Sequence, residues 1–240
     1  MTPWITAISS PGARLKAGEL GEGRRGGRDV IAFEAGVAAL PQRPDVVLKL
    51  DADVSFEPVF FEQLLAAFEA DDSLGISGGL CYELVGGEWQ AQHVTGDHVR
   101  GATRAYRWAC WLDVSPLEQQ LGWDGIDELK AELAGWTVRS LPDVPFLHHR
   151  RVGARDGARR AWEAQGATAY FMGYRFGYLL LRSLFQARKR PVAIAMIWGY
   201  LVAAAQRAPR YTDEAVVEHL RSKQALRRLA ARAREARGNA

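Results

Sequence analysis

Residues 45–58 read DVVLKLDADVSFEP, and this stretch decides the class of fold. Its first half is a short apolar run, which is the pattern of a strand buried on both faces of a sheet. Apolar side chains at residues 60–68 then recur at helical spacing. We expect Ser55 to cap this helix and Pro58 to occupy its first turn. A buried strand followed at once by a helix predicts an α/β fold built on a parallel sheet.

Two carboxylates, Asp51 and Asp53, lie where this strand ends and the chain turns over the edge of the sheet. Open α/β sheets bind ligands at that edge. Paired carboxylates suit a hard divalent cation, Mg²⁺ or Mn²⁺, held together with the phosphates of a substrate. The alternative is that one aspartate caps the helix and the other is solvated.

The composition is that of a globular protein with one sizeable core and room for an appendage, since 48% of its 240 residues are hydrophobic and 25% are charged. The net charge of +3 is small, and the basic residues of the chain become more frequent toward its C-terminus. This predicts a local basic surface and does not indicate nucleic acid. Cys81 and Cys110 are isolated, which favours free thiols in a reducing compartment, and we expect a cytoplasmic protein.

Upstream of the central strand we expect a strand at residues 4–9 and a helix at residues 30–40 capped by Asp29. The loop between them carries Arg24, Arg25 and Arg28. It is interpreted either as an arginine loop beside a phosphate or as a solvated loop. Downstream we expect strands at residues 74–77, 80–84 and 136–140. Gly78-Gly79 separates the first two strands, and Pro142 and Pro145 frame a turn after the third.

Residues 99–114 mix arginines with aromatic side chains. Such a mixture, which includes Arg104, can stack on a sugar or base and bind phosphate. A half-buried helix with snorkelling arginines explains the pattern equally well.

The next stretch, residues 121–135, reads LGWDGIDELKAELAG and places apolar residues on one helical face. Asp124 is expected at the N-cap with Asp127 three residues later, an arrangement like a capping box that would account for both acids without catalysis. His148, His149 and Arg150 follow an apolar dipeptide, a grouping that is harder to explain as structural.

The last third of the chain is predicted to be helical, which sets a boundary between residues 1–152 and an extension at 153–240. Helices are expected at residues 158–185 and 213–237, the second capped by Thr212. The apolar run at residues 192–205 is too short to span a bilayer and suits a buried or interfacial helix. We therefore expect peripheral contact with the inner face of the cell membrane.

In this order the motifs resemble those of the family 2 glycosyltransferases, bacterial enzymes with the Rossmann-like GT-A fold. The resemblance rests on VVLKLDADVSFEP, GWDGIDELKAELAGW and LHHRRVG, and the tail resembles the helical extension of members linked to surface polysaccharide synthesis. It implies inverting, metal-dependent transfer of a sugar from a nucleotide-diphospho-sugar to a hydroxyl of a saccharide or lipid-linked acceptor. The implied product is a cell-surface polysaccharide or glycolipid.

Carried over to this sequence, the resemblance implies that Asp53 binds the metal and that Asp51 lies near the metal and the ribose. His148 would complete the metal site and Arg150 the diphosphate site. Asp124 would be the catalytic base, with Asp127 as second choice because Trp123 replaces the usual glutamate. Arg28 is then expected to bind the donor, and Arg104 and Trp123 are expected to contact the acceptor.

Family members open with a β-α-β unit that precedes the strand expected at residues 4–9 and holds the base and ribose. The resemblance therefore implies an N-terminally truncated domain, through a misassigned start codon or as a natural fragment. We expect residues 1–240 alone to bind a nucleotide-sugar weakly and to turn over little.

Two other functions compete with this one. The motif Asp51-x-Asp53-x-Ser55 also resembles the nucleophile motif of haloacid dehalogenase-type phosphatases. That family has threonine in place of Ser55. It also has a later lysine, for which Lys130 is a poor substitute. The other is a non-catalytic module that binds membrane surfaces through the basic, aromatic last third of the chain.

Overall fold

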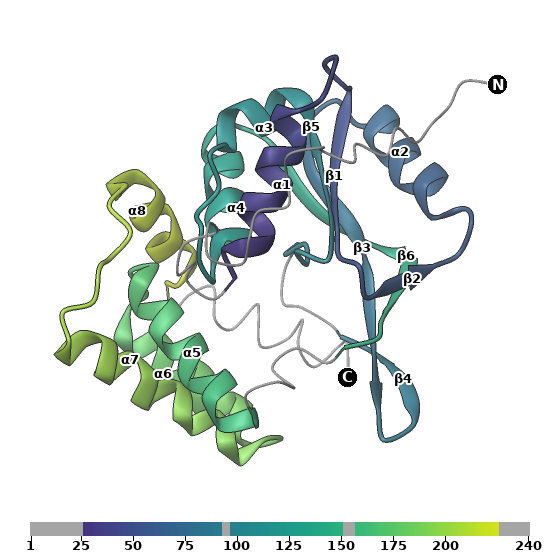
Figure 1. The fold of residues 1–240 in the computed structure, drawn as a ribbon. Helices are drawn as coiled ribbons and strands as arrows, with labels where there is room; N and C mark the ends of the chain where they lie inside the picture. Colours follow the sequence, from purple (N-terminus) through teal and green to yellow (C-terminus); the bar gives the residue numbers. More distant parts are fainter. Residues whose placement is uncertain (1–25, 93–96, 151–156, 226–240) are drawn as a thin grey trace.

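The computed structural model describes residues 26–92, 97–150 and 157–225. A sheet of six strands forms its centre, in the order β1-β5-β3-β6-β2, with β4 paired to β3 (Figure 1). The strand expected at residues 4–9 lies outside the described residues. The strands are β1 (Val46–Leu50), β2 (Val54–Phe56), β3 (Leu74–Val85), β4 (Glu88–Ala91), β5 (Thr103–Arg107) and β6 (Thr137–His148). The helices around the sheet are α1 (Arg28–Ala38), α2 (Phe60–Ala70), α3 (Trp108–Val114) and α4 (Trp123–Leu133).

The sheet is mixed, so the prediction of a mostly parallel sheet is wrong for the described part of the chain. Among its described pairings only β3 with β6 is parallel, while β1–β5, β3–β5, β2–β6 and β3–β4 are antiparallel. The apolar run of β1 indicates that the strand is buried on both faces. It does not indicate whether the neighbouring strands are parallel or antiparallel.

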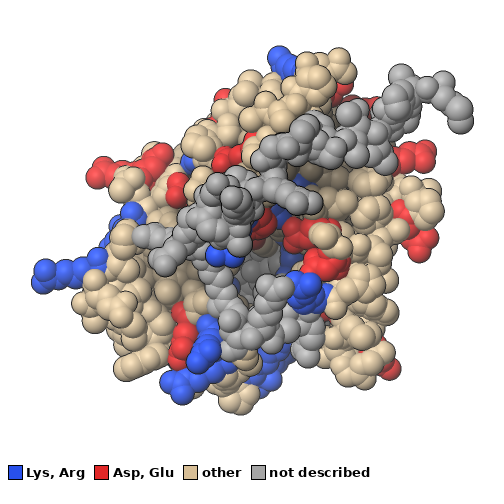
Figure 2. Space-filling view, viewed as in Figure 1, with Lys and Arg blue, Asp and Glu red and all other residues tan. Residues whose placement is uncertain are grey.

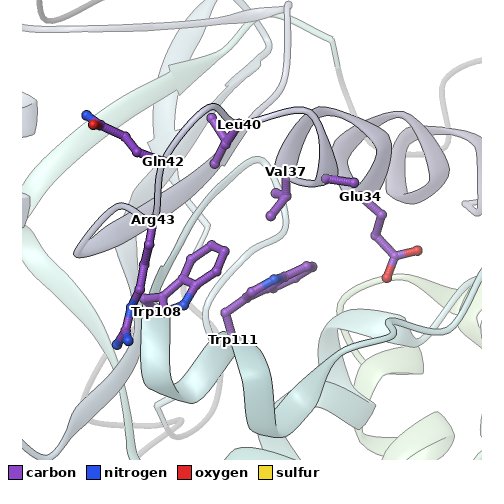
Figure 3. A pocket seen from close by; sticks show the side chains of 8 residues that line it. Glu34, Val37, Leu40, Gln42, Arg43, Trp108 and Trp111 are labelled. Carbon is purple, nitrogen blue, oxygen red and sulfur yellow. The ribbon is translucent and has the colours of Figure 1, made fainter.

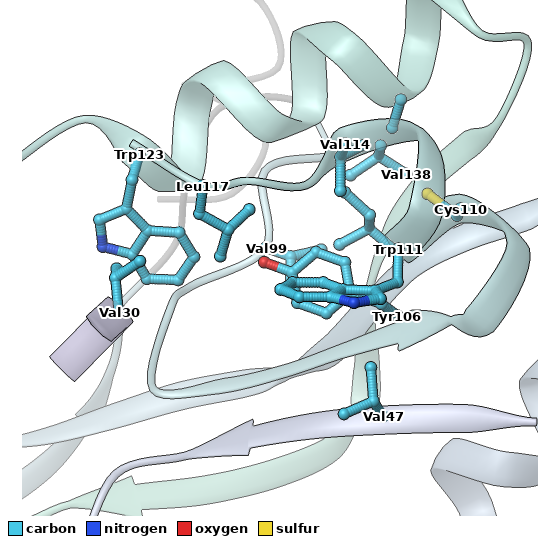
Figure 4. Packing of buried hydrophobic residues seen from close by; sticks show 12 residues of the cluster. Val30, Val47, Val99, Tyr106, Cys110, Trp111, Val114, Leu117, Trp123 and Val138 are labelled. Atoms are coloured by element: carbon cyan, nitrogen blue, oxygen red, sulfur yellow. The ribbon is translucent and has the colours of Figure 1, made fainter. Parts of the chain in front are cut away.

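Two hydrophobic cores lie on opposite faces of the sheet. Val47 of β1 points into the first core, together with side chains of α1, α3 and α4 (Figure 4). Val46 and Leu48 point into the second core, which is built on α2. Helices therefore cover both faces of β1, as the apolar run predicted.

A short strand, β2, replaces the immediate strand-to-helix turn expected after β1. Residues 54–56 pair antiparallel with β6, and α2 begins only at Phe60 with Val59 at its N-cap. The predictions that Ser55 caps α2 and that Pro58 lies in its first turn are therefore wrong. Ser55 instead hydrogen-bonds His149 through Oγ and Nε2 at 2.7 Å. The backbone of β2 finds its partners in β6, a distant segment that local pattern cannot reveal.

Gly78-Gly79 does not interrupt β3, contrary to prediction. A Cβ atom at Gly78 would overlap the carbonyl oxygen of Thr103, so glycine permits close strand packing there. In β6 the expected turn between Pro142 and Pro145 is a bulge, because the register passes from Gly79 opposite Leu141 to Leu80 opposite Pro145.

The C-terminal part is helical in its described residues, as predicted, but its boundaries differ. The helix expected at 158–185 is broken at Gly173, whose φ of 81° ends α5. Asp213, rather than Thr212, caps α8 by accepting a hydrogen bond from the Val216 amide at 3.2 Å. The elements are α5 (Gly157–Phe171), α6 (Phe176–Ala187), the 3₁₀ helix η1 (Pro191–Ile194), α7 (Ala195–Ala205) and α8 (Glu214–Lys223).

The helical part is joined to the sheet part through α8, which packs on α4. Val216 and Leu220 of α8 share a buried cluster with Ile126 and Leu129 of α4. Within the described residues, no helix is both long and apolar enough to cross a membrane.

Candidate metal and transfer site

Asp51, Asp53 and His148 come together at one end of the sheet. One ligand atom of each lies within 4.8 Å of the others, and His148 Nε2 is 3.4 Å from Asp53 Oδ1. The strands fix this meeting: Val54 pairs with His148, and the His149 amide donates to the Asp53 carbonyl at 2.9 Å. Residues separated by almost a hundred positions are thus held by the antiparallel pairing of β2 with β6.

Arg150 lies on the other side of the Asp53 carboxylate, with Nε 3.4 Å from Oδ2. Its side chain is 56% exposed. The guanidinium can therefore reach a ligand as well as Asp53, and its planar donors match a phosphate. The grouping of two carboxylates, an imidazole and an exposed arginine is chemically suited to a divalent cation with a diphosphate.

Lys49, which was not among the predicted site residues, neutralises one of the two aspartates. Its Nζ donates to Asp51 Oδ1 at 2.5 Å and to the Gly101 carbonyl at 3.2 Å, and lies 3.1 Å from Asp29 Oδ2. Lys49 is buried, and a buried charge needs a partner. Its place inside an apolar strand was therefore a signal in the sequence that a carboxylate lies nearby. Asp53, which faces His148 and Arg150, is left as the stronger candidate ligand.

The acid-bearing helix α4 starts two residues earlier than expected, at Trp123, so Asp124 is not its N-cap. Gly122 holds that position with a φ of 94°, and no side chain caps the helix. The predicted capping box is therefore wrong, and capping does not explain Asp124. Its side chain lies in the first turn, is 34% exposed, and has Oδ2 3.8 Å from His98 Nε2.

Asp127 and Glu128 lie beneath Asp124 and surround Arg104, whose side chain is 0% exposed. Arg104 donates to both oxygens of Asp127, at 2.9 and 2.7 Å, and to Glu128 Oε1 at 3.1 Å. The Tyr106 hydroxyl also donates to Asp127, at 2.6 Å. Arg104 is thus a buried structural cation, and the expected contact with an acceptor does not fit its position.

Burial and charge shift the pKa values of this group in different directions. Burial raises the pKa of Asp127 to about 6, against the lowering effect of Arg104. Burial would also raise the pKa of Glu128, but His98 and Arg104 outweigh burial and lower it. Burial opposes protonation of His98, yet the carboxylates of Glu128 and Asp124 raise its pKa above the usual value. His98 Nδ1 lies 2.9 Å from Glu128 Oε2.

Trp123 does not present an exposed face for an acceptor, contrary to expectation. Its ring is buried in the first core, with Lys49 Nζ 5.5 Å from the ring centroid (Figure 4). Because Lys49 also holds Asp51, this contact connects the aspartate pair with the start of α4. Arg28 begins α1 and is exposed, while Arg24 and Arg25 lie outside the described residues.

Removing the buried cation should be costly for stability. We expect Arg104→Met to lower the free energy of unfolding by about 3–5 kcal/mol, because two buried carboxylates lose their partner. Chemical denaturation measures this change. The exposed Arg160 provides the control, since Arg160→Met should change stability by about 0.5 kcal/mol at most. Equal stability of the two variants would contradict the structural role of Arg104.

A separate pocket of about 420 Å³ lies between the end of α1 and the start of α3 (Figure 3). Trp108, Trp111 and Arg43 line it together with Glu34. The Glu34 carboxylate accepts a hydrogen bond from the Leu117 amide at 2.8 Å and so has a structural partner. None of the candidate metal ligands lines this pocket, and we do not assign it to the site.

No protein-family model matches this sequence, and no curated protein matches it. Among solved structures, the chain is similar to a glycosyltransferase. That protein is the mannosyltransferase PcManGT from Pyrobaculum calidifontis, in complex with GDP-Man and Mn²⁺. The TM-score is 0.45 and the sequence identity is 12%, over 86% of this chain and 58% of that one. This chain therefore spans less than two thirds of the mannosyltransferase, and function has to be derived from the side chains.

Proposed function

We propose that this protein is a glycosyltransferase of the GT-A type, related to family 2, that transfers a sugar from a nucleotide-diphospho-sugar to an acceptor hydroxyl. The observation that carries the proposal is the meeting of Asp51, Asp53 and His148 beside the exposed Arg150. The acceptor class that we propose is a saccharide or a lipid-linked saccharide of cell-surface polysaccharide or glycolipid synthesis.

The donor set fits Mg²⁺ or Mn²⁺, since it offers carboxylate oxygens with one imidazole nitrogen. When bound, such an ion neutralises the charge that develops on the departing diphosphate. Asp53 and His148 would hold it, with Asp51 alongside and restrained by Lys49. Arg150 would bind the diphosphate oxygens, with Arg28 as a further candidate for the donor.

Asp124 is the proposed base that takes the proton of the acceptor hydroxyl in a single inverting displacement. It is the most accessible acid of α4, because Asp127 and Glu128 are buried around Arg104. His98 bridges the Asp124 and Glu128 side chains and so restrains the orientation of Asp124. Asp127 is left to position α4 through Arg104 and Tyr106.

The phosphatase alternative gains no support from the described contacts. Lys130, which it would need near Asp51, donates to the carbonyls of Val114 and Pro116 at 3.1 Å. Asp51 is instead bound by Lys49. A phosphoenzyme trapped on Asp51 would favour the phosphatase.

The proposed activity is tested with the metal-stripped protein and a panel of nucleotide-diphospho-sugars. Hydrolysis or transfer should require added Mn²⁺ or Mg²⁺ and stop in EDTA. Calorimetric titration with Mn²⁺ alone gives a second readout that does not depend on the identity of the donor. Turnover at the same rate in EDTA, or no Mn²⁺ binding, would overturn the proposal.

We also propose that the helical part contacts an anionic membrane surface. The outward faces of α6 and of the η1–α7 segment are apolar, and Ser183 of α6 donates to the Ala193 carbonyl of η1 at 2.9 Å. Basic groups gather along the lower edge of this part of the molecule (Figure 2). Residues 164–212 contain seven arginines and lysines and no aspartate or glutamate. The exposed large apolar side chains there are Phe176, Leu180, Leu181, Leu184, Phe185, Ile194, Trp198 and Leu201.

An apolar face flanked by cations is the composition of interfacial helices. We expect the protein to sediment with vesicles that contain anionic lipid and to bind neutral vesicles more weakly, with the difference reduced by salt. Introducing charges by Leu184→Glu and Trp198→Glu should abolish sedimentation.

The control for this prediction is Leu112→Glu, because Leu112 is 57% exposed on α3, close to the 49% and 58% of Leu184 and Trp198. This variant should bind vesicles like the parent protein. Dimerisation that Trp198→Glu disrupts, without vesicle binding, would show that a second copy covers the face instead.

A further inference from the structure

A second group of potential metal ligands lies next to the proposed site and includes a sulfur atom. Cys81 and Glu83 occupy alternate positions of β3, and Glu83 pairs with His148 on the parallel strand β6. Alternate residues of a strand share one face. The Cys81 thiol, the Glu83 carboxylate and the His148 imidazole consequently converge, with one ligand atom of each within 4.8 Å of the others. All three residues are buried.

The chemistry of this group differs from that of the two aspartates. Thiolate, imidazole and carboxylate are the ligands of Zn²⁺, whereas Mg²⁺ and Mn²⁺ favour oxygen. We propose that Cys81, Glu83 and His148 form a second cation site, selective for a thiophilic divalent ion such as Zn²⁺. The site shares His148 with Asp51 and Asp53.

The metal-free protein keeps these groups unreactive. Burial raises the pKa of the Cys81 thiol to about 11, so the sulfur holds its proton. Arg100 balances the Glu83 charge, with Nη1 3.8 Å from Oε1. Binding breaks the S–H bond, forms a sulfur–metal bond and releases one proton to solvent, while the ion replaces Arg100 as the partner of Glu83.

Sharing of His148 has a consequence that rests on the proposed function. An ion bound through Cys81 withdraws the imidazole from the aspartate pair, so Zn²⁺ should inhibit a Mn²⁺-dependent transfer. Binding at Cys81 can be measured without any activity, and failure of one proposal does not imply failure of the other.

Cobalt(II) is the probe, because a bond from Co²⁺ to thiolate absorbs in the near ultraviolet and a bond to oxygen or nitrogen does not. The full chain, stripped of metal, should develop this absorption with one equivalent of Co²⁺ and lose it when Zn²⁺ is added. Cys81→Ser should abolish the absorption. Asp53→Asn should retain it, which separates this site from the proposed catalytic one.

Cys110→Ser is the matched control, because Cys110 is also a buried free thiol but packs in the first core on the opposite face of the sheet. It should leave the absorption unchanged. If Cys81→Ser is poorly folded, Glu83→Gln keeps the thiol and should weaken Co²⁺ binding at least tenfold. No absorption with the parent protein, or equal absorption with Cys81→Ser, would overturn the proposal.

Discussion

Replacing Asp53 with asparagine should abolish metal-dependent hydrolysis or transfer of the donor sugar. The Asp53 carboxylate lies between His148 and Arg150, and Asp51 is already paired with Lys49. An amide keeps the size of the side chain but removes the charge that attracts the cation. Because loss of a supporting group alone costs about 10–100-fold in metal affinity, loss of this ligand should cost at least that much. Calorimetry with Mn²⁺ and a hydrolysis assay measure the two effects.

The control for this change is Asp72→Asn, since Asp72 is an exposed acid outside the site. It should bind Mn²⁺ and turn over donor like the parent protein. Both variants should unfold at similar temperatures, because Asp53 is partly exposed and its contacts are long. Unchanged Mn²⁺ affinity and activity in Asp53→Asn would show that these side chains form only an ion-pair cluster.

A second large effect is expected for Asp124→Asn, which should reduce transfer by about 10²–10⁴-fold, the usual contribution of a general base. Stability should change by about 0.5 kcal/mol at most, because Asp124 is partly exposed and does not cap α4. The experiment measures the transfer rate per folded molecule and the free energy of unfolding for the same preparation.

Asp127→Asn provides the contrast. It leaves Arg104 with a weaker partner in a fully buried position, so it should lower stability by several kcal/mol, about 3–5 if the ion pair is lost. Its rate per folded molecule should stay closer to that of the parent than the rate of Asp124→Asn. The opposite ranking would make Asp127 the base and would assign Asp124 a minor role.

Local spacing predicted several features of the fold correctly. The apolar run at residues 46–50 is a strand buried on both faces, and α2 and α4 follow where the apolar residues recur at helical spacing. These features depend on neighbours within a few positions, which the sequence shows directly. The sequence also identified Asp51, Asp53 and His148 as candidate metal ligands. It predicted correctly that Cys81 and Cys110 are free thiols.

The sequence could not show that Arg104 and Trp123 would be buried. Arg104 and Trp123 were expected at an acceptor, yet they pack inside, where Arg104 binds Asp127 and Trp123 contacts Lys49. An arginine or a tryptophan serves a surface or a core equally well by composition. The choice depends on partners from distant elements: the carboxylates of α4 for Arg104, and the apolar cluster between α1 and α3 for Trp123.

The sequence by itself determined where β1, α2 and α4 form and that two carboxylates follow β1. Only the tertiary structure decided the strand directions, the insertion of β2 between Asp53 and α2, and the meeting of Asp53 with His148. The physical reason is that apolar periodicity reports burial along one segment, whereas strand pairing satisfies backbone hydrogen bonds between segments far apart in the chain. The candidate site is formed by that pairing.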